Sequence, residues 1–389
     1  MMIKIANFVT DQKFIDGVID ILSLPGYECT HEYIHISDNK NDFTFIKNGD
    51  KVKILKRERV LSYLYENNFD AVFVHGMFGE HRSIVPLIDL SIKVFWFGWG
   101  FDMYLFPRMK PAINLKLYHP RTQKFLGIKS QGLFSRILKG IKGDKELYRN
   151  KSYLNDIHCI YRADYFSGVL PVEYDLIKKN NYFRAQHVYF KYTNMSDLER
   201  YEKREKYSLG DNIIVGNSAA IRGNHLDILT YLEKLKIGGR KVYLPLSYQK
   251  DNKYIETVSR EYKKSLGDRL VVLEDFMPYD EYSKIIQSCG IGIFYFEGQA
   301  AMGNINMLLW NGAKVFLSKT SIVYKYFKQM GMYIYNVQHD LIKEDFYKPL
   351  SDAMRDRNRD LIYKMKSKST IVNNLNQIYD YIATGHSLA

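Results

Sequence analysis

Short apolar runs alternate with amphipathic stretches along almost the whole chain of 389 residues. Apolar runs of about 4–8 residues bounded by turn residues are typical of buried strands, whereas apolar residues recurring every three or four positions are typical of helices. The first half therefore has helical patterns at 13–22 and 57–66. Its predicted strands are 3–9, 33–36, 71–75, 93–97, 166–170 and 187–190.

The second half shows a cleaner alternation of the same two patterns. The last stretch, 351–383, reads as helix with no strand after it. Strands that alternate with helices over this length predict parallel, doubly wound sheets. The predicted strands are 213–215, 241–244, 270–273, 291–296, 314–317 and 333–335. The predicted helices are 225–235, 252–265, 280–288, 305–311, 322–330 and 341–350.

The chain is long enough for two domains of about 150–200 residues each. A polar stretch near 192–210 separates the two alternations, so we expect a first domain over 1–195 and a second over 196–389. This is an α/β architecture of two doubly wound Rossmann-like domains with a cleft between them and a C-terminal helix. Dehydrogenases, epimerases and the GT-B class of glycosyltransferases share it, with ligands at the carboxyl ends of the strands.

Several sequence signatures are absent from the chain. No G-x-G-x-x-G follows a strand and no Walker pattern occurs, which disfavours dehydrogenases and excludes P-loop NTPases. No Asp-x-Asp occurs, which argues against metal-dependent GT-A transferases, and we expect neither a metal ion nor a cofactor. Three scattered cysteines give no disulfide framework or metal spacing. Without a leader or an apolar run of 18 residues, a cytoplasmic protein is expected.

Positive charge is concentrated in one part of the chain. The net charge is +13, and the window 108–151 alone, with twelve basic and two acidic residues, carries +10. Apolar residues are interleaved with the basic ones, so the segment 106–151 resembles a basic amphipathic surface that lies on anionic membranes. We expect peripheral attachment to the inner face of the cell membrane. A solvated loop and helix, or binding to nucleic acid, remain alternatives.

The loop 216–225 follows a predicted strand and precedes a predicted helix. Its glycines permit close backbone approach to a ligand, and helix N-terminal amides beside an arginine suit a diphosphate. Asn224 is equally a good helix cap, and Gly-Asn-Ser is an ordinary turn composition. The candidate nucleotide-sugar-binding residues of this loop are Gly216, Asn217, Ser218, Arg222, Asn224 and His225.

Two further predicted strands end in loops of similar character. After 291–296, backbone amides suit phosphate, and Glu or Gln side chains suit sugar hydroxyls. After 270–273, an apolar shelf suits a nucleobase. Each loop could also be a connection without a ligand. The candidates here are Phe276, Met277, Glu297, Gln299, Met302, Gly303 and Asn304.

Residues in both halves of the chain match the motifs of one known family. In the second half these are Gly216-Asn217-Ser218, Asn224-His225, Pro245 with Tyr248, Asp280 with Tyr282, and Gln299 with Gly303. In the first half, Trp99-Gly100-Phe101-Asp102-Met103-Tyr104 resembles that family's Trp-Gly-x-Asp-Leu-Tyr. The chain thus resembles, over about 69–336, the N-acetylfucosamine transferases of enterobacterial common antigen synthesis, a 4-alpha-L-fucosyltransferase-like family.

The resemblance implies a GT-B enzyme that moves an N-acetylated deoxysugar from a TDP-sugar to an undecaprenyl-diphosphate-linked glycan. It adds Tyr248 and Tyr282 to the donor-site candidates. Ala220-Ile221 stand where the family has Asp-Arg, and Gln299-Ala300 where it has paired glutamines, so the donor sugar stays open. A sugar-nucleotide epimerase, or a non-enzymatic protein that binds nucleic acid, is the alternative.

A transferase that inverts the sugar needs a general base to take the proton of the acceptor hydroxyl. Asp102 is the first candidate, His75 at the end of a predicted strand the second, and Glu80 the third. Asp102 could instead cap a helix after a glycine turn. A retaining enzyme would need less of a base and more stabilisation of the departing diphosphate.

Overall fold

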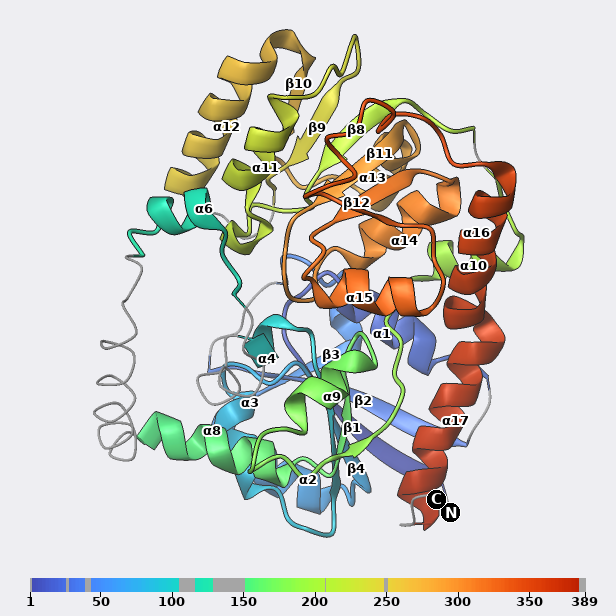
Figure 1. The fold of residues 1–389 in the computed structure, drawn as a ribbon. Helices are drawn as coiled ribbons and strands as arrows, with labels where there is room; N and C mark the ends of the chain where they lie inside the picture. The colour runs from blue at the N-terminus through green and yellow to red at the C-terminus, as the bar shows by residue number, and fades with distance from the viewer. Residues whose placement is uncertain are drawn as a thin grey trace. The chain divides into compact units, whose positions relative to one another are not determined.

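The computed structural model describes residues 2–25, 28–38, 43–104, 116–128, 151–206, 208–247 and 251–384. These residues form two compact units (Figure 1). Unit 1 comprises Met1–Asn114, Gln131–Lys203 and Lys366–Ala389, and unit 2 comprises Leu115–Ser130 and Arg204–Met365. The main boundary thus lies after Lys203, near the predicted junction, but each unit also takes in a segment that the sequence placed in the other domain.

The described part of unit 1 contains a seven-stranded parallel sheet in the order β3-β2-β1-β4-β5-β6-β7. The chain runs outward from β1 to β3 and then returns to the other side of β1, so the strand order reverses between β1 and β4. The strands are β1 (Ile3–Val9), β2 (Cys29–Ile36), β3 (Val52–Leu55), β4 (Ala71–His75), β5 (Lys93–Phe97), β6 (Tyr165–Ser167) and β7 (Gln186–His187).

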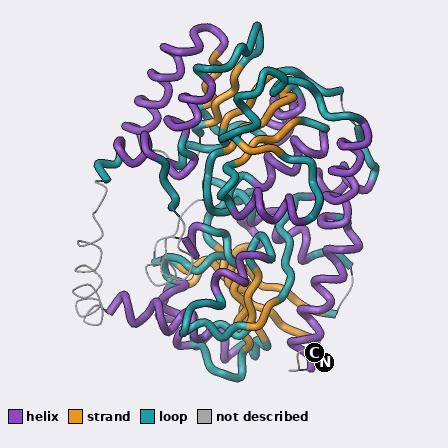
Figure 2. Tube along the Cα trace, viewed as in Figure 1, coloured by secondary structure: helices purple, strands orange, loops and turns teal. Residues whose placement is uncertain are grey.

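Helices cover the sheet of unit 1, as the tube in Figure 2 shows. The C-terminal helix α17 (Lys368–Thr384) places Ile371, Leu375 and Ile378 in the same buried core as β1, because their spacing puts them on one helix face. The last helix of the predicted second domain, 196–389, therefore belongs to unit 1. The other helices are α1 (Ile15–Leu22), α2 (Arg57–Glu66), α3 (His81–Ile84), α4 (Phe101–Tyr104), α8 (Lys151–Arg162), α9 (Val172–Ile177) and α10 (Met195–Glu202).

The described part of unit 2 contains a six-stranded parallel sheet in the order β10-β9-β8-β11-β12-β13. Its strand order reverses between β8 and β11. The strands are β8 (Asn212–Val215), β9 (Val242–Pro245), β10 (Leu270–Leu273), β11 (Cys289–Phe294), β12 (Lys314–Leu317) and β13 (Tyr335–Asn336). The helices are α6 (Pro120–Phe125), α11 (His225–Leu232), α12 (Asn252–Leu266), α13 (Tyr279–Gln287), α14 (Met302–Asn311), α15 (Ile322–Gln329) and α16 (Asp352–Lys366).

One predicted helix is absent from the structure, and one strand was not predicted. The helix predicted at 341–350 is a series of turns, because the carboxylate of Asp340 accepts hydrogen bonds from the backbone and side chain of Asn336 and holds a non-helical loop. Strand β3 was not predicted, because it is four residues long and only Val52 in it is buried.

None of the described helices is long and apolar enough to cross a membrane. Most of the basic segment 106–151 lies outside the described residues, apart from 116–128 and the start of α8.

Candidate active site

The carboxyl ends of β8 and β11 lie next to each other where the strand order of unit 2 reverses, the usual ligand site of a doubly wound sheet. The loop after β8 begins at Gly216, whose φ is +68°. A Cβ added there would lie 2.5 Å from Nε2 of His225, so only glycine fits. Backbone and imidazole thus approach each other closely at this strand end.

His225 is fully buried and has one ring nitrogen without a hydrogen-bond partner among the described residues, Nε2. The hydroxyl oxygen of Tyr254 accepts from the backbone N–H of His225 and lies 3.1 Å from Nδ1. In the tautomer in which Tyr254 donates its proton to Nδ1, the ring proton lies on Nε2. Burial lowers the pKa of His225 to about 4, so the ring is neutral at pH 7.

An unpaired N–H buried against glycine backbone can bind a hydrogen-bond acceptor of a ligand. Leaving a buried donor unpaired costs about 1–3 kcal/mol, which favours filling the site with an acceptor. Nε2–H of His225 lies against Gly216 and Gly223 at the N-terminal end of α11. Helix N-termini favour anions, so a phosphate oxygen is a suitable acceptor here.

Asn224 adopts the left-handed conformation, with φ +53°, and its carboxamide organises the loop. Its Oδ1 accepts from the backbone N–H of His119 at 2.9 Å. Its Nδ2 donates to the carbonyls of Arg222 and Tyr295, both at 2.8 Å, and lies 3.1 Å from that of Leu117. Protein groups thus occupy the polar atoms of Asn224, which fixes both loops rather than offering a free ligand group.

Residues 116–128, which the sequence analysis placed in the first domain, pack on unit 2. The carboxylate of Asp227 on α11 accepts from the backbone N–H groups of Arg121 and Thr122, at 2.8 and 3.0 Å, and so caps α6. Phe125 packs edge-on against Tyr254, with ring centroids 5.2 Å apart. Figure 1 shows α6 beside α11 and α12.

This segment brings His119 into contact with the loop after β11. Nε2 of His119 lies 2.8 Å from Oε1 of Glu297, and the ring stacks on Tyr295 with centroids 3.9 Å apart. Ser318 donates to the same carboxylate oxygen at 2.6 Å. Burial alone would raise the pKa of Glu297, but the hydrogen bonds from His119, Ser318 and Thr320 lower it below its usual value. The carboxylate is therefore ionised at pH 7.

The loop after β11 ends at the N-terminus of α14. Ala301, which precedes the helix, is held at φ +56°, a strained conformation that is common at functional sites. The first N–H groups of the helix, from Met302 to Asn304, have no partner inside the helix and suit an anion. The side chain of Asn304 donates to the hydroxyl of Tyr282 at 2.6 Å and so joins α14 to α13.

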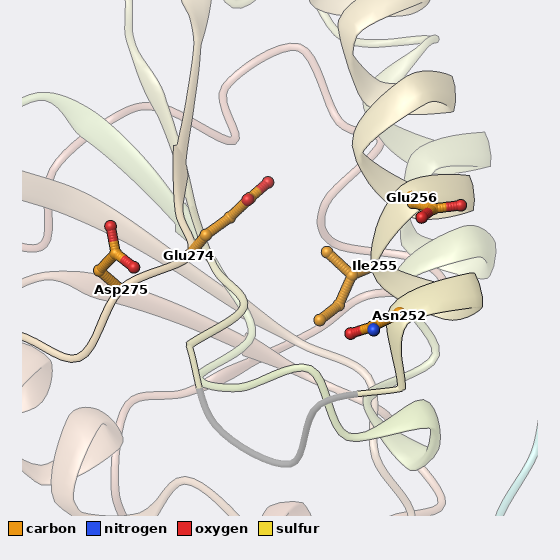
Figure 3. A pocket seen from close by; sticks show the side chains of 5 residues that line it. All are labelled: Asn252, Ile255, Glu256, Glu274 and Asp275. Carbon is orange, nitrogen blue, oxygen red and sulfur yellow. The ribbon is translucent and has the colours of Figure 1, made fainter.

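A third strand end, that of β10, borders a pocket of about 230 Å³ (Figure 3). Glu274 points from this strand end toward α12, whereas Asp275 points the other way. Carboxylates repel phosphate and accept hydrogen bonds from hydroxyl and amino groups, so the pocket suits a nucleoside better than a diphosphate. Phe276, next along the loop, is 58% exposed, as an apolar shelf requires. The pocket is lined by Asn252, Ile255, Glu256, Glu274 and Asp275.

The structure thus gathers most donor-site candidates at the carboxyl ends of β10, β8 and β11 in one sheet, with β9 between β10 and β8. Tyr248 lies outside the described residues. The loop after β8 carries Gly216, Asn217, Ser218, Arg222, Asn224 and His225. The loop after β11 and the first turn of α14 carry Glu297, Gln299, Met302, Gly303 and Asn304, and the loop after β10 carries Phe276 and Met277.

Asp102, the first candidate for the base, is 1% exposed in unit 1. Its Oδ2 accepts from the backbone N–H of Met77 and from Nε1 of Trp96, both at 2.9 Å. Its Oδ1 accepts from the backbone N–H of Trp99 at 2.8 Å. Burial raises the pKa of this carboxyl, and the three donors oppose the rise. The arrangement ties the loops after β4 and β5 together and leaves little of the carboxylate for an acceptor.

His75 and Glu80, the other two candidates, differ sharply in exposure. His75 is fully buried, with Tyr192 at 2.9 Å from Nδ1 and Asn7 at 3.2 Å from Nε2, and burial lowers its pKa to about 3. Glu80 is exposed and lies 3.6 Å from Arg57 at the edge of a pocket of about 450 Å³. Of the three candidate bases, only Glu80 is exposed to solvent.

Comparison with known proteins supports a sugar-transfer chemistry. Residues 165–358 match the model of the 4-alpha-L-fucosyltransferase family, glycosyl transferase group 56. A glycosyltransferase from Rickettsia africae is 12% identical, with 99% of each chain covered and a TM-score of 0.59. The Anabaena protein HepE, solved with UDP and glucose, is 10% identical, with 98% of this chain and 100% of that chain covered and a TM-score of 0.61.

A third similar structure is sucrose-phosphate synthase from Thermosynechococcus elongatus, which is 10% identical, with 99% of this chain and 100% of that chain covered and a TM-score of 0.63. At such low identities the three structures show the fold alone. That fold is GT-B, so the predicted fold class is confirmed, and the family match confirms the resemblance drawn from the sequence.

Proposed function

Because the chain belongs to the glycosyltransferases of group 56, we propose that it moves an N-acetylated deoxysugar from TDP to a polyprenyl-diphosphate-linked glycan. The class of reaction follows from the family, whereas the donor and the acceptor follow from the motifs that the sequence shares with it. The basic segment 106–151 supports an acceptor at an anionic membrane surface, on the cytoplasmic face, because such a segment is attracted to acidic lipids.

The buried, unpaired Nε2 of His225 is the observation that carries the proposal, in the tautomer that places the ring proton there. In sugar transfer, negative charge develops on the departing diphosphate, and donors already in place stabilise it without further reorganisation. Nε2–H of His225, the N–H groups at the start of α14 and the guanidinium of Arg222 are donors of this kind on the two loops. They hold the diphosphate without a metal ion.

The remaining donor-site groups fit the two ends of the nucleotide-sugar. Phe276 and the acidic pocket after β10 are assigned to the base and ribose, because nucleotides run across the carboxyl ends of the strands in such sheets and β10 is two strands from β8. Gln299, only 8% exposed, lies in the loop after β11 and supplies polar atoms for sugar hydroxyls. The three strand ends together therefore account for base, diphosphate and sugar.

The proposal is tested by donor binding and by transfer. His225→Phe keeps a buried ring but removes the Nε2–H, so TDP should bind about 10–150-fold more weakly, since a hydrogen bond to a charged group contributes about 1.5–3 kcal/mol. Calorimetry with TDP measures this, and His339→Phe, at an exposed histidine of unit 2, is the matched control. Unchanged TDP affinity in a folded His225→Phe protein would contradict the proposed diphosphate site.

Transfer itself is measured with a panel of labelled TDP-, UDP- and GDP-sugars and a polyprenyl-diphosphate-linked oligosaccharide. We expect label from the TDP-linked N-acetylated deoxysugar in the organic phase, and slow release of free sugar when the acceptor is omitted. An epimerised nucleotide-sugar formed without acceptor would instead identify an epimerase.

A further inference from the structure

His119 and Glu297 form a pair in unit 2 that diphosphate binding does not use. Nε2 of His119 lies 2.8 Å from Oε1 of Glu297, whose side chain is 5% exposed and whose carboxylate is ionised. An ionised carboxylate can only accept hydrogen bonds, so the ring proton of His119 lies on Nε2. In the neutral ring, the second nitrogen, Nδ1, then carries a lone pair.

That lone pair is open to a ligand. Among the described residues, no group hydrogen-bonds Nδ1 of His119, and 19% of its side chain is exposed. One face of the ring lies on Tyr295, at an interplanar angle of 17°. An imidazole held at one nitrogen by a buried carboxylate and open at the other is the arrangement by which proteins position a base.

The ring is also fixed in place relative to the diphosphate cradle. The backbone N–H of His119 donates to Asn224, which in turn holds the carbonyls of Arg222 and Tyr295. Two residues further on, the carboxylate of Asp227 holds the backbone of α6. Both loops of the donor site and His119 therefore share the hydrogen bonds of one asparagine, which limits their relative movement.

We infer that His119 is the general base of the transfer reaction and that Glu297 orients it, an inference that rests on the proposed function. Nδ1 takes the proton of the acceptor hydroxyl while the hydroxyl oxygen forms a bond to the anomeric carbon. The bond from that carbon to the diphosphate breaks, and its electron pair leaves with the nucleoside diphosphate. Glu297 stabilises the resulting imidazolium, which then returns its proton to water. This displacement inverts the anomeric configuration.

The base is tested with His119→Gln, whose amide can still donate to Glu297, and with His119→Ala. Loss of a positioned base costs about 10²–10⁴-fold in rate, so kcat should fall by that factor while TDP affinity stays near that of the unaltered protein. Free imidazole added to His119→Ala should restore part of kcat, which a purely structural defect would not allow. His339→Ala, at an exposed histidine of the same unit, is the control.

Glu297→Gln keeps an acceptor for Nε2 of His119 but removes the charge that stabilises the imidazolium. It should lower kcat with little change in the KM for the donor, and imidazole should not restore it. The inference is overturned if His119→Ala or His119→Gln retains nearly full kcat, if Glu80→Gln abolishes turnover in their place, or if the product keeps the donor's anomeric configuration. Absence of any donor hydrolysis or transfer by the unaltered protein would instead overturn the proposed function, and this inference with it.

Discussion

The two units have the same kind of sheet and the same reversal of strand order, between β1 and β4 in unit 1 and between β8 and β11 in unit 2. Polar residues stand at both places. In unit 1, His75 and Asp102 are buried and paired with protein groups at every ring nitrogen and carboxylate oxygen. In unit 2, Nε2 of His225 and Nδ1 of His119 have no such partner among the described residues.

This difference sets His75 and Asp102 apart from His225 and His119. A buried polar group with all its hydrogen bonds made contributes to stability and is costly to replace. A group with an unmade bond in an ordered site is available to a ligand or a substrate proton. The reversal of strand order therefore marks a possible site in both units, and Nε2 of the buried His81, at the start of α3, likewise has no partner among the described residues. The diphosphate chemistry is proposed for unit 2 because Nε2 of His225 lies there at the N-terminus of α11.

Acidification should show the largest difference between the units. The pKa values of His31, His75 and His81 in unit 1 are lowered to about 4, 3 and 4, and that of His225 in unit 2 to about 4, all mainly by burial. An unfolded histidine binds a proton below pH 6.5, so each buried one loses stability as the pH falls from about 6.5 toward 4. At pH 5 the loss of stability is about 2 kcal/mol for each histidine, or about 6 kcal/mol in unit 1 and about 2 kcal/mol in unit 2.

Hydrogen exchange followed by mass spectrometry, corrected for the intrinsic rate, measures this loss for each unit between pH 7 and pH 5. We expect peptides from β1 and β4 to lose more protection than those from β8 and β11. Equal losses in the two units would show that they unfold together or that the histidines of unit 1 are less protected than their burial indicates.

Asp102→Asn should have the next largest effect. The structure predicts that this effect is on stability rather than on turnover. The sequence alone made Asp102 a base, whose loss would lower turnover. Here, an amide nitrogen would face the N–H of Trp99, or those of Met77 and Trp96, so stability should fall by about 3 kcal/mol. Urea denaturation measures this. At a temperature where the variant is folded, its kcat should be near normal, and a large loss of kcat with unchanged stability would restore Asp102 as the base.

Much of the fold follows from local pattern. The strands at 270–273 and 314–317 have the predicted bounds, because short apolar runs between helical patterns are typical of buried strands. Strand β3 and the turns at 341–350 were missed, because their conformations depend on side-chain hydrogen bonds and edge pairing rather than on periodicity. The placement of α17 in unit 1 depends on long-range packing, which its amphipathic pattern leaves open.

The candidate site could be predicted in part for a similar reason. The loop residues after β8 and β11 carry glycine and small polar residues next to strands, and this signal is local. His119 has no such signal, because its role depends on contacts with Asn224 and Glu297, more than 100 positions away in the chain. The basic residues around it in the sequence suggested a membrane surface instead.

Removal of metal ions should have the smallest effect of these changes. It tests whether hydrogen-bond donors of unit 2, rather than a metal ion, neutralise the diphosphate. Among the described residues, no group of three or more His, Cys, Asp and Glu side chains could hold a metal ion. If His225, Arg222 and the start of α14 carry the diphosphate charge, excess EDTA should leave transfer unchanged, as measured with labelled donor and lipid-linked acceptor. A loss that Mg²⁺ or Mn²⁺ reverses would mean that a metal ion, not N–H donors, neutralises the leaving group. The unpaired Nε2–H of His225 would then need another explanation, and the assignment of the chemistry to unit 2 would rest on His119 and Glu297 alone.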